Sequence, residues 1–141
     1  MLVALGVRWL SRKCSVVLYE FATEADENPD VIAQVLAQLP LRSVLGHVVV
    51  SGEGIWLPTR IVHLGRNNMI QRTPGSVYLY APGQSICLTY GEITESATVN
   101  KFGQVLDDDL PTLRRLGEHV YQQTVAQACR SIVKINLRSV A

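Results

Sequence analysis

The chain has 141 residues, of which 48% are hydrophobic and only 18% are charged, whereas soluble domains on average carry roughly 25% charged residues. Its formal net charge of +1 excludes a strong nucleic-acid-binding surface, because such a surface needs several lysines and arginines on one face. The length is typical of one core, so we expect a single domain over residues 1–141. A charge-poor surface favours self-association, which makes a homo-oligomer the first expectation.

The cysteines and histidines do not indicate a metal site or a cofactor. Cys14, Cys87 and Cys129 lie far apart without metal-ligand spacing, and they are expected to be small buried residues in a reducing, cytoplasmic compartment. No stretch approaches the ~18 consecutive apolar residues of a membrane span, so no membrane partner is expected. No nucleotide-binding glycine loop is present, and we therefore predict no cofactor and no metal.

The first third of the chain predicts two strands and a helix. Residues 3–10 and 14–21 flank Ser11-Arg12-Lys13 and are typical of a strand pair with a tight turn. Asn28-Pro29-Asp30 is a helix start, in which the asparagine caps the first free N–H groups. The apolar residues that follow recur at helical spacing up to Pro40, at positions 32, 35, 36 and 39.

The middle and the end of the chain are mostly extended. We predict one extended segment over residues 43–58, with its glycines at bulges, and then a basic loop over residues 59–75. A hairpin follows, with strands at 76–80 and 85–91, and then a strand at 97–106 with a bulge at Gly103. A second helix starts near residues 107–109, Gly117 kinks or divides it, and a last strand covers residues 133–140.

These elements amount to a mainly β fold with two or three helices. Seven or eight strands, with one helix near each end of the series, fit a closed barrel whose open ends are covered by helices. An open sheet with both helices on one face is the alternative. A barrel covered on both sides also explains part of the charge scarcity, because it needs more apolar positions than a half-exposed sheet.

The hairpin carries a family resemblance. Residues 75–91 read GSVYLYAPGQSICLTYG, and together with residues 99–105 and 110–117 they resemble the small bacterial cyclophilin-like β-barrel family. The chain is also similar to the N-terminal domain of cucumopine synthase, an opine-forming enzyme that condenses an amino acid with a keto acid. The resemblance implies a closed cyclophilin-like β-barrel and a pocket for amino-acid-like molecules.

One feature of that family is missing here. Its prolyl isomerases follow their first helix with a Phe-His-Arg strand whose arginine acts on the substrate, whereas this chain reads Gly46-His47-Val48. The Gln-Gly-Gly-Asp that comes next in those enzymes is replaced by Ser-Gly-Glu-Gly at residues 51–54. Peptidyl-prolyl isomerase activity is therefore the weaker hypothesis.

His47 and Glu53 are the candidate catalytic residues. On an unbroken strand their side chains would point to the same face but lie about 20 Å apart. A bulge at Gly52 would be needed to bring them together. A histidine and a partly buried glutamate can both act as acid or base near neutral pH. The alternative is a histidine satisfied by a backbone carbonyl and a glutamate at a solvated strand end.

The candidate ligand-binding residues are basic and aromatic. Arginines of the loop at 59–75 can clamp a carboxylate bidentately, and tyrosines of the hairpin can line a pocket or pack in the core. The alternative for the basic residues is a solvated loop. The predicted ligand-binding set is Arg60, His63, Arg66, Tyr78, Tyr80 and Tyr90, and Arg72 belongs to the same loop.

Three functions remain open at this level. The first is a protein that binds a small carboxylate or amino-acid-like molecule and acts on it by acid/base chemistry, as an opine synthase would. The second is a peptidyl-prolyl isomerase. The third is a noncatalytic oligomeric binding subunit.

Overall fold

The computed structural model describes residues 2–9, 17–23, 28–66 and 68–139, and over these residues the protein is mainly β. Every strand pair is antiparallel. The strands are β1 (Leu2–Trp9), β2 (Val17–Thr23), β3 (Leu41–His47), β4 (Gly52–Pro58), β5 (Ile70–Gln71), β6 (Ser76–Tyr80), β7 (Ser85–Ile93), β8 (Thr98–Val105) and β9 (Val133–Ser139). The α-helices are α1 (Pro29–Ala37) and α2 (Leu110–Tyr121); short 3-10 turns cover Ala81–Gly83 and Asp107–Asp109, and a π-helical turn, Gln122–Ala126, follows α2.

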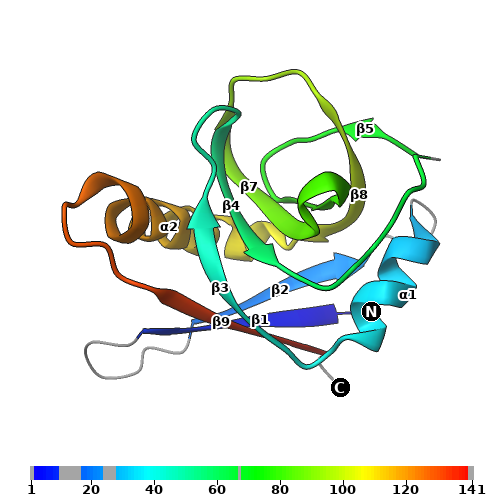
Figure 1. Cartoon of the computed structure of the whole chain (residues 1–141), viewed down its shortest axis with the longest axis horizontal. Coiled ribbons are helices and arrows are strands. Elements are labelled where there is room, and N and C mark those ends of the chain that lie inside the picture. The colour runs from blue at the N-terminus through cyan, green and yellow to red at the C-terminus, as the bar shows by residue number, and fades with distance from the viewer. Residues whose placement is uncertain (1, 10–16, 24–27, 67, 140–141) are drawn as a thin grey trace.

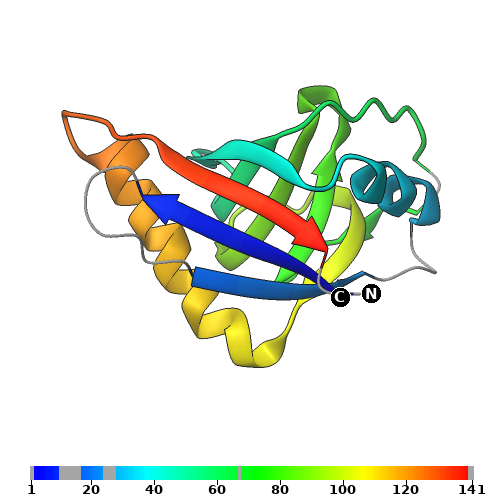
Figure 2. The same ribbon diagram turned by 90° about the horizontal axis from the view of Figure 1, so that it is seen from below.

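The sheet is strongly curved, with the order β2-β1-β9-β3-β4-β7-β6-β8-β5. Its two helices lie at opposite ends of the curved sheet (Figures 1 and 2). β2 pairs with β1 over six residue pairs but meets β8 over only three, at Phe21–Thr23. A fully closed barrel, which needs a continuous seam, is therefore not supported.

The N-terminal strand pair is confirmed, because β1 and β2 are antiparallel neighbours. The tight turn expected at residues 11–13 lies outside the described residues, as do Cys14 and residues 24–27 of the acidic loop. The last strand is also confirmed: β9 lies between β1 and β3 and pairs with both. The N-terminal and C-terminal strands of the chain therefore form one part of the sheet.

Helix α1 is confirmed, but the predicted capping by Asn28 is wrong. The Asn28 side chain makes no capping hydrogen bond. Its Nδ2 donates instead to the carbonyl oxygens of Asn68 and Lys101, over 3.1 Å and 2.7 Å. The start of α1 is thereby attached both to β8 and to the loop that precedes β5.

The predicted extended segment at residues 43–58 is two strands, β3 and β4, joined by a turn at residues 48–51. Gly52 permits the turn because its φ is +118°, and a Cβ there would overlap the carbonyl oxygen of Glu92. The Val48 N–H donates to the Gly54 carbonyl over 2.9 Å. The chain therefore folds back and returns Glu53 alongside the end of β3.

The hairpin of β6 and β7 is confirmed, and β8 has a bulge, one residue before the predicted Gly103. Val77 pairs with Gly103 and Tyr78 pairs with Lys101, so Phe102 is the extra residue of the bulge, and it is fully buried. The predicted division of this helix at Gly117 is wrong, because α2 is continuous there. A Cβ at this position would overlap the ring of Tyr90, so the glycine allows α2 to pack closely on β7.

The pairing register separates the side chains of the central strands into two faces, since successive strand residues point to opposite sides. One row runs His47–Ile55–Leu88–Val77, and its apolar members belong to the main core, with residues of α1 and α2. The next row runs Gly46–Trp56–Cys87–Tyr78 on the opposite, outer face. A small second cluster of Tyr78, Cys87 and Val99 lies on that outer face.

Candidate functional site

A cavity with a volume of about 700 Å³ lies among the predicted site residues and involves this outer face. Its walls come from the turn between β3 and β4, from Trp56, Tyr78 and Cys87 on the sheet, and from the connection between β7 and β8. We call it the Arg72 cavity, because Arg72 is the buried cation in its lining. The volume is within the range of small-molecule sites in proteins.

Arg72 is held by three hydrogen bonds. Its Nη1 donates to the Tyr78 hydroxyl over 3.3 Å, and its Nη2 donates to the carbonyl oxygens of Ser51 and Glu95 over 3.3 Å and 3.1 Å. The Glu95 carboxylate lies 3.7 Å from Nη2 and is more than half exposed. The guanidinium therefore joins the two loops that form the cavity walls.

One donor of Arg72 is left over. Its Nε is buried and has no hydrogen-bond partner among the described residues. A buried donor without a partner is unfavourable and uncommon in folded proteins. Arg72 can therefore offer a hydrogen bond and a positive charge to an anionic ligand.

Tyr78 and Cys87 are cross-strand partners beside Arg72. Burial raises the pKa of the Tyr78 hydroxyl to about 12, and the nearby Cys87 acts in the same direction while Arg72 opposes it. Burial also raises the pKa of the Cys87 thiol to about 12. Both groups are therefore protonated and neutral near pH 7, which suits packing and hydrogen bonding rather than nucleophilic attack.

The rim of the Arg72 cavity is apolar and aromatic. Val49 and Val50 in the turn between β3 and β4 are 80% and 84% exposed, and Tyr80 is 54% exposed. Trp56 is also partly exposed and lines the same cavity. Aromatic and aliphatic walls around a single buried cation fit a ligand that has an apolar body and one acidic group.

The two predicted catalytic residues lie close to a third group, Tyr90, on the core side of the sheet. The His47 ring also borders the Arg72 cavity, but its Nε2 accepts a hydrogen bond from the Tyr90 hydroxyl over 2.7 Å. Its Nδ1 donates to the Val48 carbonyl, so the hydrogen bonds favour the neutral tautomer with the proton on Nδ1. Both ring nitrogens are thus engaged within the chain.

Burial lowers the pKa of His47, while the hydrogen bond to Val48 and the charge of Glu53 act in the opposite direction.

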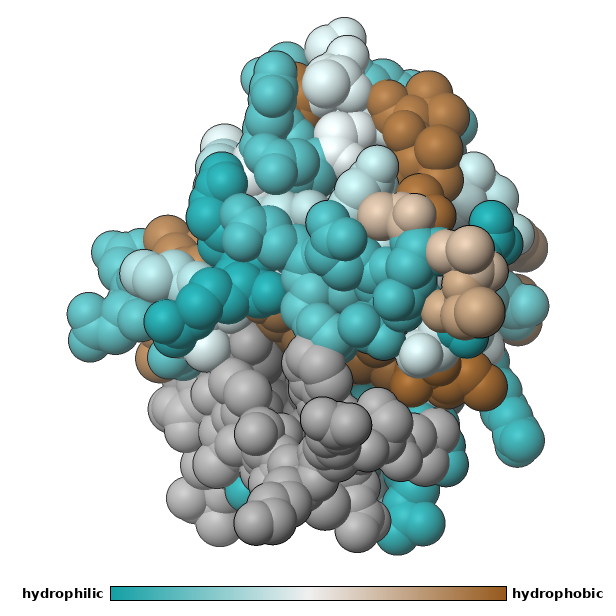
Figure 3. Space-filling model, turned by 90° about the vertical axis from the view of Figure 1, so that its left-hand side faces the viewer, coloured by the Kyte–Doolittle hydropathy of each residue, from teal (hydrophilic) through white to brown (hydrophobic). Residues whose placement is uncertain are grey.

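Glu53 accepts a hydrogen bond from the Glu92 N–H over 2.9 Å, and its Oε1 lies 3.7 Å from Nη2 of Arg114 on α2. Among the residues coloured in Figure 3, which views the side where α2 lies, hydrophilic ones predominate, and hydrophobic ones gather mainly toward the right of the view. Glu53 therefore connects β4, β7 and α2 at a solvated edge.

The predicted ligand-binding residues are divided among different places. Tyr78 and Tyr80 line the Arg72 cavity, whereas the Tyr90 ring lies on the opposite face of the sheet, against Gly117. His63 and Arg66 line a second pocket. Arg60 is exposed and lines neither cavity; its backbone N–H donates to Gln38.

The predicted set omits Arg72, Trp56, Cys87 and Glu95, which line the cavity. The sequence places Arg72 in a basic loop, whereas the structure buries it. Cys87 could have been found from the alternation of side chains in the hairpin, because it lies directly opposite Tyr78 and therefore on the same face of the sheet. Nothing in the local pattern of residues 59–75 distinguishes Arg72 from its exposed neighbours.

In the part of the chain that the structure describes, no three histidine, cysteine or acidic side chains are grouped to hold a metal ion. Among the same residues, no helix has both the length and the apolar character needed to cross a bilayer. Cys87 and Cys129 are free thiols, one buried and one exposed. The expectation of a buried cysteine is therefore confirmed for Cys87 and wrong for Cys129.

The chain is similar in fold to two solved structures. A structure of McbB in complex with tryptophan matches with a TM-score of 0.80 and 21% identity, over 97% of this chain and 46% of McbB. The solution structure of the hypothetical protein AF2241 from Archaeoglobus fulgidus matches with a TM-score of 0.63 and 16% identity, over 99% of this chain and 95% of that one. The chain thus spans less than half of the McbB chain.

No protein-family model matches the chain, and no curated protein sequence matches it. The resemblance to cyclophilin-like barrels and to cucumopine synthase therefore stays a prediction. At 21% and 16% identity, the two structural matches concern the fold alone.

Proposed function

We propose that the protein binds a small carboxylate with an apolar or aromatic body, such as an aromatic amino acid, in the Arg72 cavity. The observation that carries the proposal is the buried guanidinium of Arg72, whose Nε has no partner among the described residues. A ligand carboxylate would accept that hydrogen bond and neutralise the charge. The Glu95 carboxylate is exposed at the rim and neutralises Arg72 less effectively than a buried anion would.

The walls of the cavity favour the same class of ligand. Trp56 and Tyr80 offer aromatic surface, and Val49 and Val50 offer apolar surface that is otherwise exposed to water. Covering these side chains with an apolar ligand body removes their surface from water, which stabilises the complex. McbB, whose fold is similar, has been solved in complex with tryptophan, and this supports tryptophan as the first ligand to test.

Calorimetric titration with three related compounds tests the proposal. L-tryptophan and indole-3-propionate carry the carboxylate, and tryptamine lacks it. We expect the two carboxylates to bind and tryptamine to bind at least about tenfold more weakly, because it has no acceptor for Arg72. Equal binding of tryptamine and L-tryptophan would contradict the proposal.

Arg72→Met keeps most of the side-chain length and removes the guanidinium. Loss of one member of a buried charged contact commonly costs binding about thirtyfold or more, so we expect L-tryptophan binding to fall by at least that factor. Arg60→Met is the matched control, since Arg60 lies on the same loop but lines neither cavity. Circular dichroism of both variants verifies that they fold.

Acid/base catalysis by His47 and Glu53 is a second proposal, in the sense expected for an opine-synthase-like enzyme. Two observations favour it. His47 lines the Arg72 cavity and is hydrogen-bonded to the Tyr90 hydroxyl, and Glu53 is close enough to affect the pKa of Tyr90. On this proposal, His47→Ala keeps ligand binding in the Arg72 cavity and loses turnover of the bound ligand. Unchanged turnover in His47→Ala would show that His47 has a structural role.

A further inference from the structure

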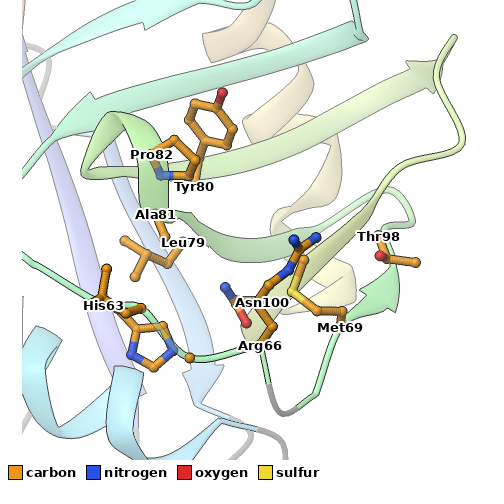
Figure 4. Close-up of a pocket in the computed structure, with 11 residues that line it drawn as sticks. His63, Arg66, Met69, Leu79, Tyr80, Ala81, Pro82, Thr98 and Asn100 are labelled. Atoms are coloured by element: carbon orange, nitrogen blue, oxygen red, sulfur yellow. The ribbon is translucent and has the colours of Figure 1, made fainter.

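A second hollow lies beside the Arg72 cavity and has a volume of about 380 Å³ (Figure 4). Residues 63–66 and 69 line it on one side, and the ends of β6 and β8 line it on the other. We call it the Asn100 pocket after the buried polar side chain in its wall. Its apolar surface includes Leu79 and Met69.

Asn100 is the feature of this pocket that points to a ligand. The residue is only 3% exposed, and its Oδ1 is buried with no hydrogen-bond partner in the described part of the chain. Folded proteins rarely leave a buried acceptor unsatisfied, because the group has lost its water without a replacement. Asn100 Oδ1 is therefore placed to accept a hydrogen bond from a bound molecule.

Basic side chains complete the pocket. Arg66 is exposed and His63 is half-buried, and both line the same hollow. The loop that carries them is attached to α1, because Asn28 Nδ2 donates to the Asn68 carbonyl over 3.1 Å. An acceptor, a cation and an apolar wall thus line the same pocket.

We propose that the Asn100 pocket binds a small carboxylic acid that also carries an N–H or O–H donor, of the amino-acid or hydroxy-acid class. The carboxylate would bind Arg66 and His63, the donor group would bind Asn100 Oδ1, and a short apolar side chain would pack on Leu79 and Met69. This second site does not depend on the function proposed for the Arg72 cavity.

The two cavities adjoin each other. Tyr80 and Thr98 line both of them, and Figure 4 shows the Tyr80 ring directed away from Asn100 and His63. Two small molecules would therefore bind on either side of Tyr80. Substitutions at Arg72 and at Asn100 should each weaken one binding event without removing the other.

Three probes of similar size test the donor and the carboxylate separately. L-alanine has both groups, propionate has only the carboxylate, and L-alaninol has the donors without the carboxylate. In ¹H–¹⁵N spectra of the labelled protein, titrated to about 50 mM because ligands of this size bind weakly, we expect L-alanine to shift the signals of Asn100 and Arg66. Propionate and L-alaninol should bind at least about fivefold more weakly; equal binding of propionate, or no shift at Asn100 with L-alanine, would overturn the proposal.

Variants give a second test. Asn100→Leu removes the unsatisfied acceptor and keeps the size of the side chain, so we expect an unchanged or higher unfolding midpoint together with at least a tenfold loss of L-alanine affinity. Arg66→Gln should also weaken L-alanine binding, whereas Arg60→Gln, on the same loop but outside the pocket, should not. Wild-type affinity in Asn100→Leu would overturn the proposal, and the probe series on the unmodified protein decides the matter if that variant does not fold.

The two sites fail separately. If L-tryptophan binds with the Arg72 dependence described above but L-alanine does not shift the signals of Asn100, the proposal for the Arg72 cavity is supported and the proposal for the Asn100 pocket is contradicted. If L-alanine shifts Asn100 while no indole carboxylate binds, the reverse holds.

Discussion

The guanidinium of Arg72 donates a hydrogen bond to the Tyr78 hydroxyl over 3.3 Å at the wall of the Arg72 cavity. The relationship joins a residue of the loop before β6 to a residue of β6 itself. It places a positive charge in a cavity whose other walls are mainly aromatic and aliphatic. The contact helps to explain why an arginine is tolerated in a buried position.

Tyr78→Phe removes the hydroxyl and leaves Nη1 of Arg72 without that acceptor. Leaving a buried donor unsatisfied typically costs about 1–3 kcal/mol, so we expect a loss of that size in the free energy of unfolding, measured by urea denaturation. Tyr80→Phe is the matched control on the same strand, and because Tyr80 is 54% exposed, we expect a change within about 0.5 kcal/mol. Equal effects of the two substitutions would argue against a structural role for the Tyr78 contact.

Gly117→Ala should destabilise the protein although alanine favours helices. The added Cβ would overlap the Tyr90 ring, and overpacking of this kind costs about 1–3 kcal/mol, against a gain in helix propensity of at most about 1 kcal/mol. In a Tyr90→Leu background the cost should shrink, because the ring is gone. A double-mutant cycle by thermal unfolding measures this coupling, and additive effects would contradict the contact.

Acid should destabilise the protein partly through His47. Burial lowers the pKa of His47 in the folded state, so below the usual histidine pKa of about 6.5 the unfolded chain binds more protons than the folded one. The stabilisation is therefore present above pH about 6.5 and is lost as the pH falls through the lowered value. His47→Gln should show a smaller loss of stability between pH 7 and pH 5 in urea denaturation.

His119 has a pKa that burial also lowers, so His119→Gln is a necessary comparison for the acid effect. If the pH dependence of His47→Gln equals that of the wild type, burial of His47 does not keep its imidazole neutral in the folded protein.

The two described thiols should differ strongly in reactivity. Cys87 is buried and its pKa is raised to about 12, whereas Cys129 is exposed. In a Cys14→Ser background, a thiol reagent at pH 8 should label Cys129 rapidly and Cys87 only when the chain unfolds. Labelling followed by mass spectrometry measures both rates, and rapid labelling of Cys87 in the folded protein would contradict its burial.

The local sequence pattern was sufficient for several elements. Helix α1 was predictable because apolar residues recur at helical spacing between Pro29 and Pro40. The hairpin of β6 and β7 was predictable because alternating strands flank Pro82-Gly83. These signals depend only on residues that are close in the sequence, and the same is true of β9.

The turn between β3 and β4 was not predictable from the same rules. Apolar residues continue through Val48, Val49 and Val50, which is typical of an uninterrupted strand. The turn is decided by the pairing of β4 with both β3 and β7, partners that lie up to about forty residues away in the sequence. The partial seam between β2 and β8 is likewise a property of the curved sheet.

The sequence by itself determined a single mainly β chain with few charges, a helix near each end of the strand series, and tyrosines on both arms of one hairpin. Only the tertiary structure decided which side chains meet: it separated Tyr78 from Tyr90, buried Arg72 and left Arg60 in solvent. The reason is physical, since residue spacing sets helix and strand periodicity, whereas burial and charge pairing depend on strands that become neighbours only when the sheet forms.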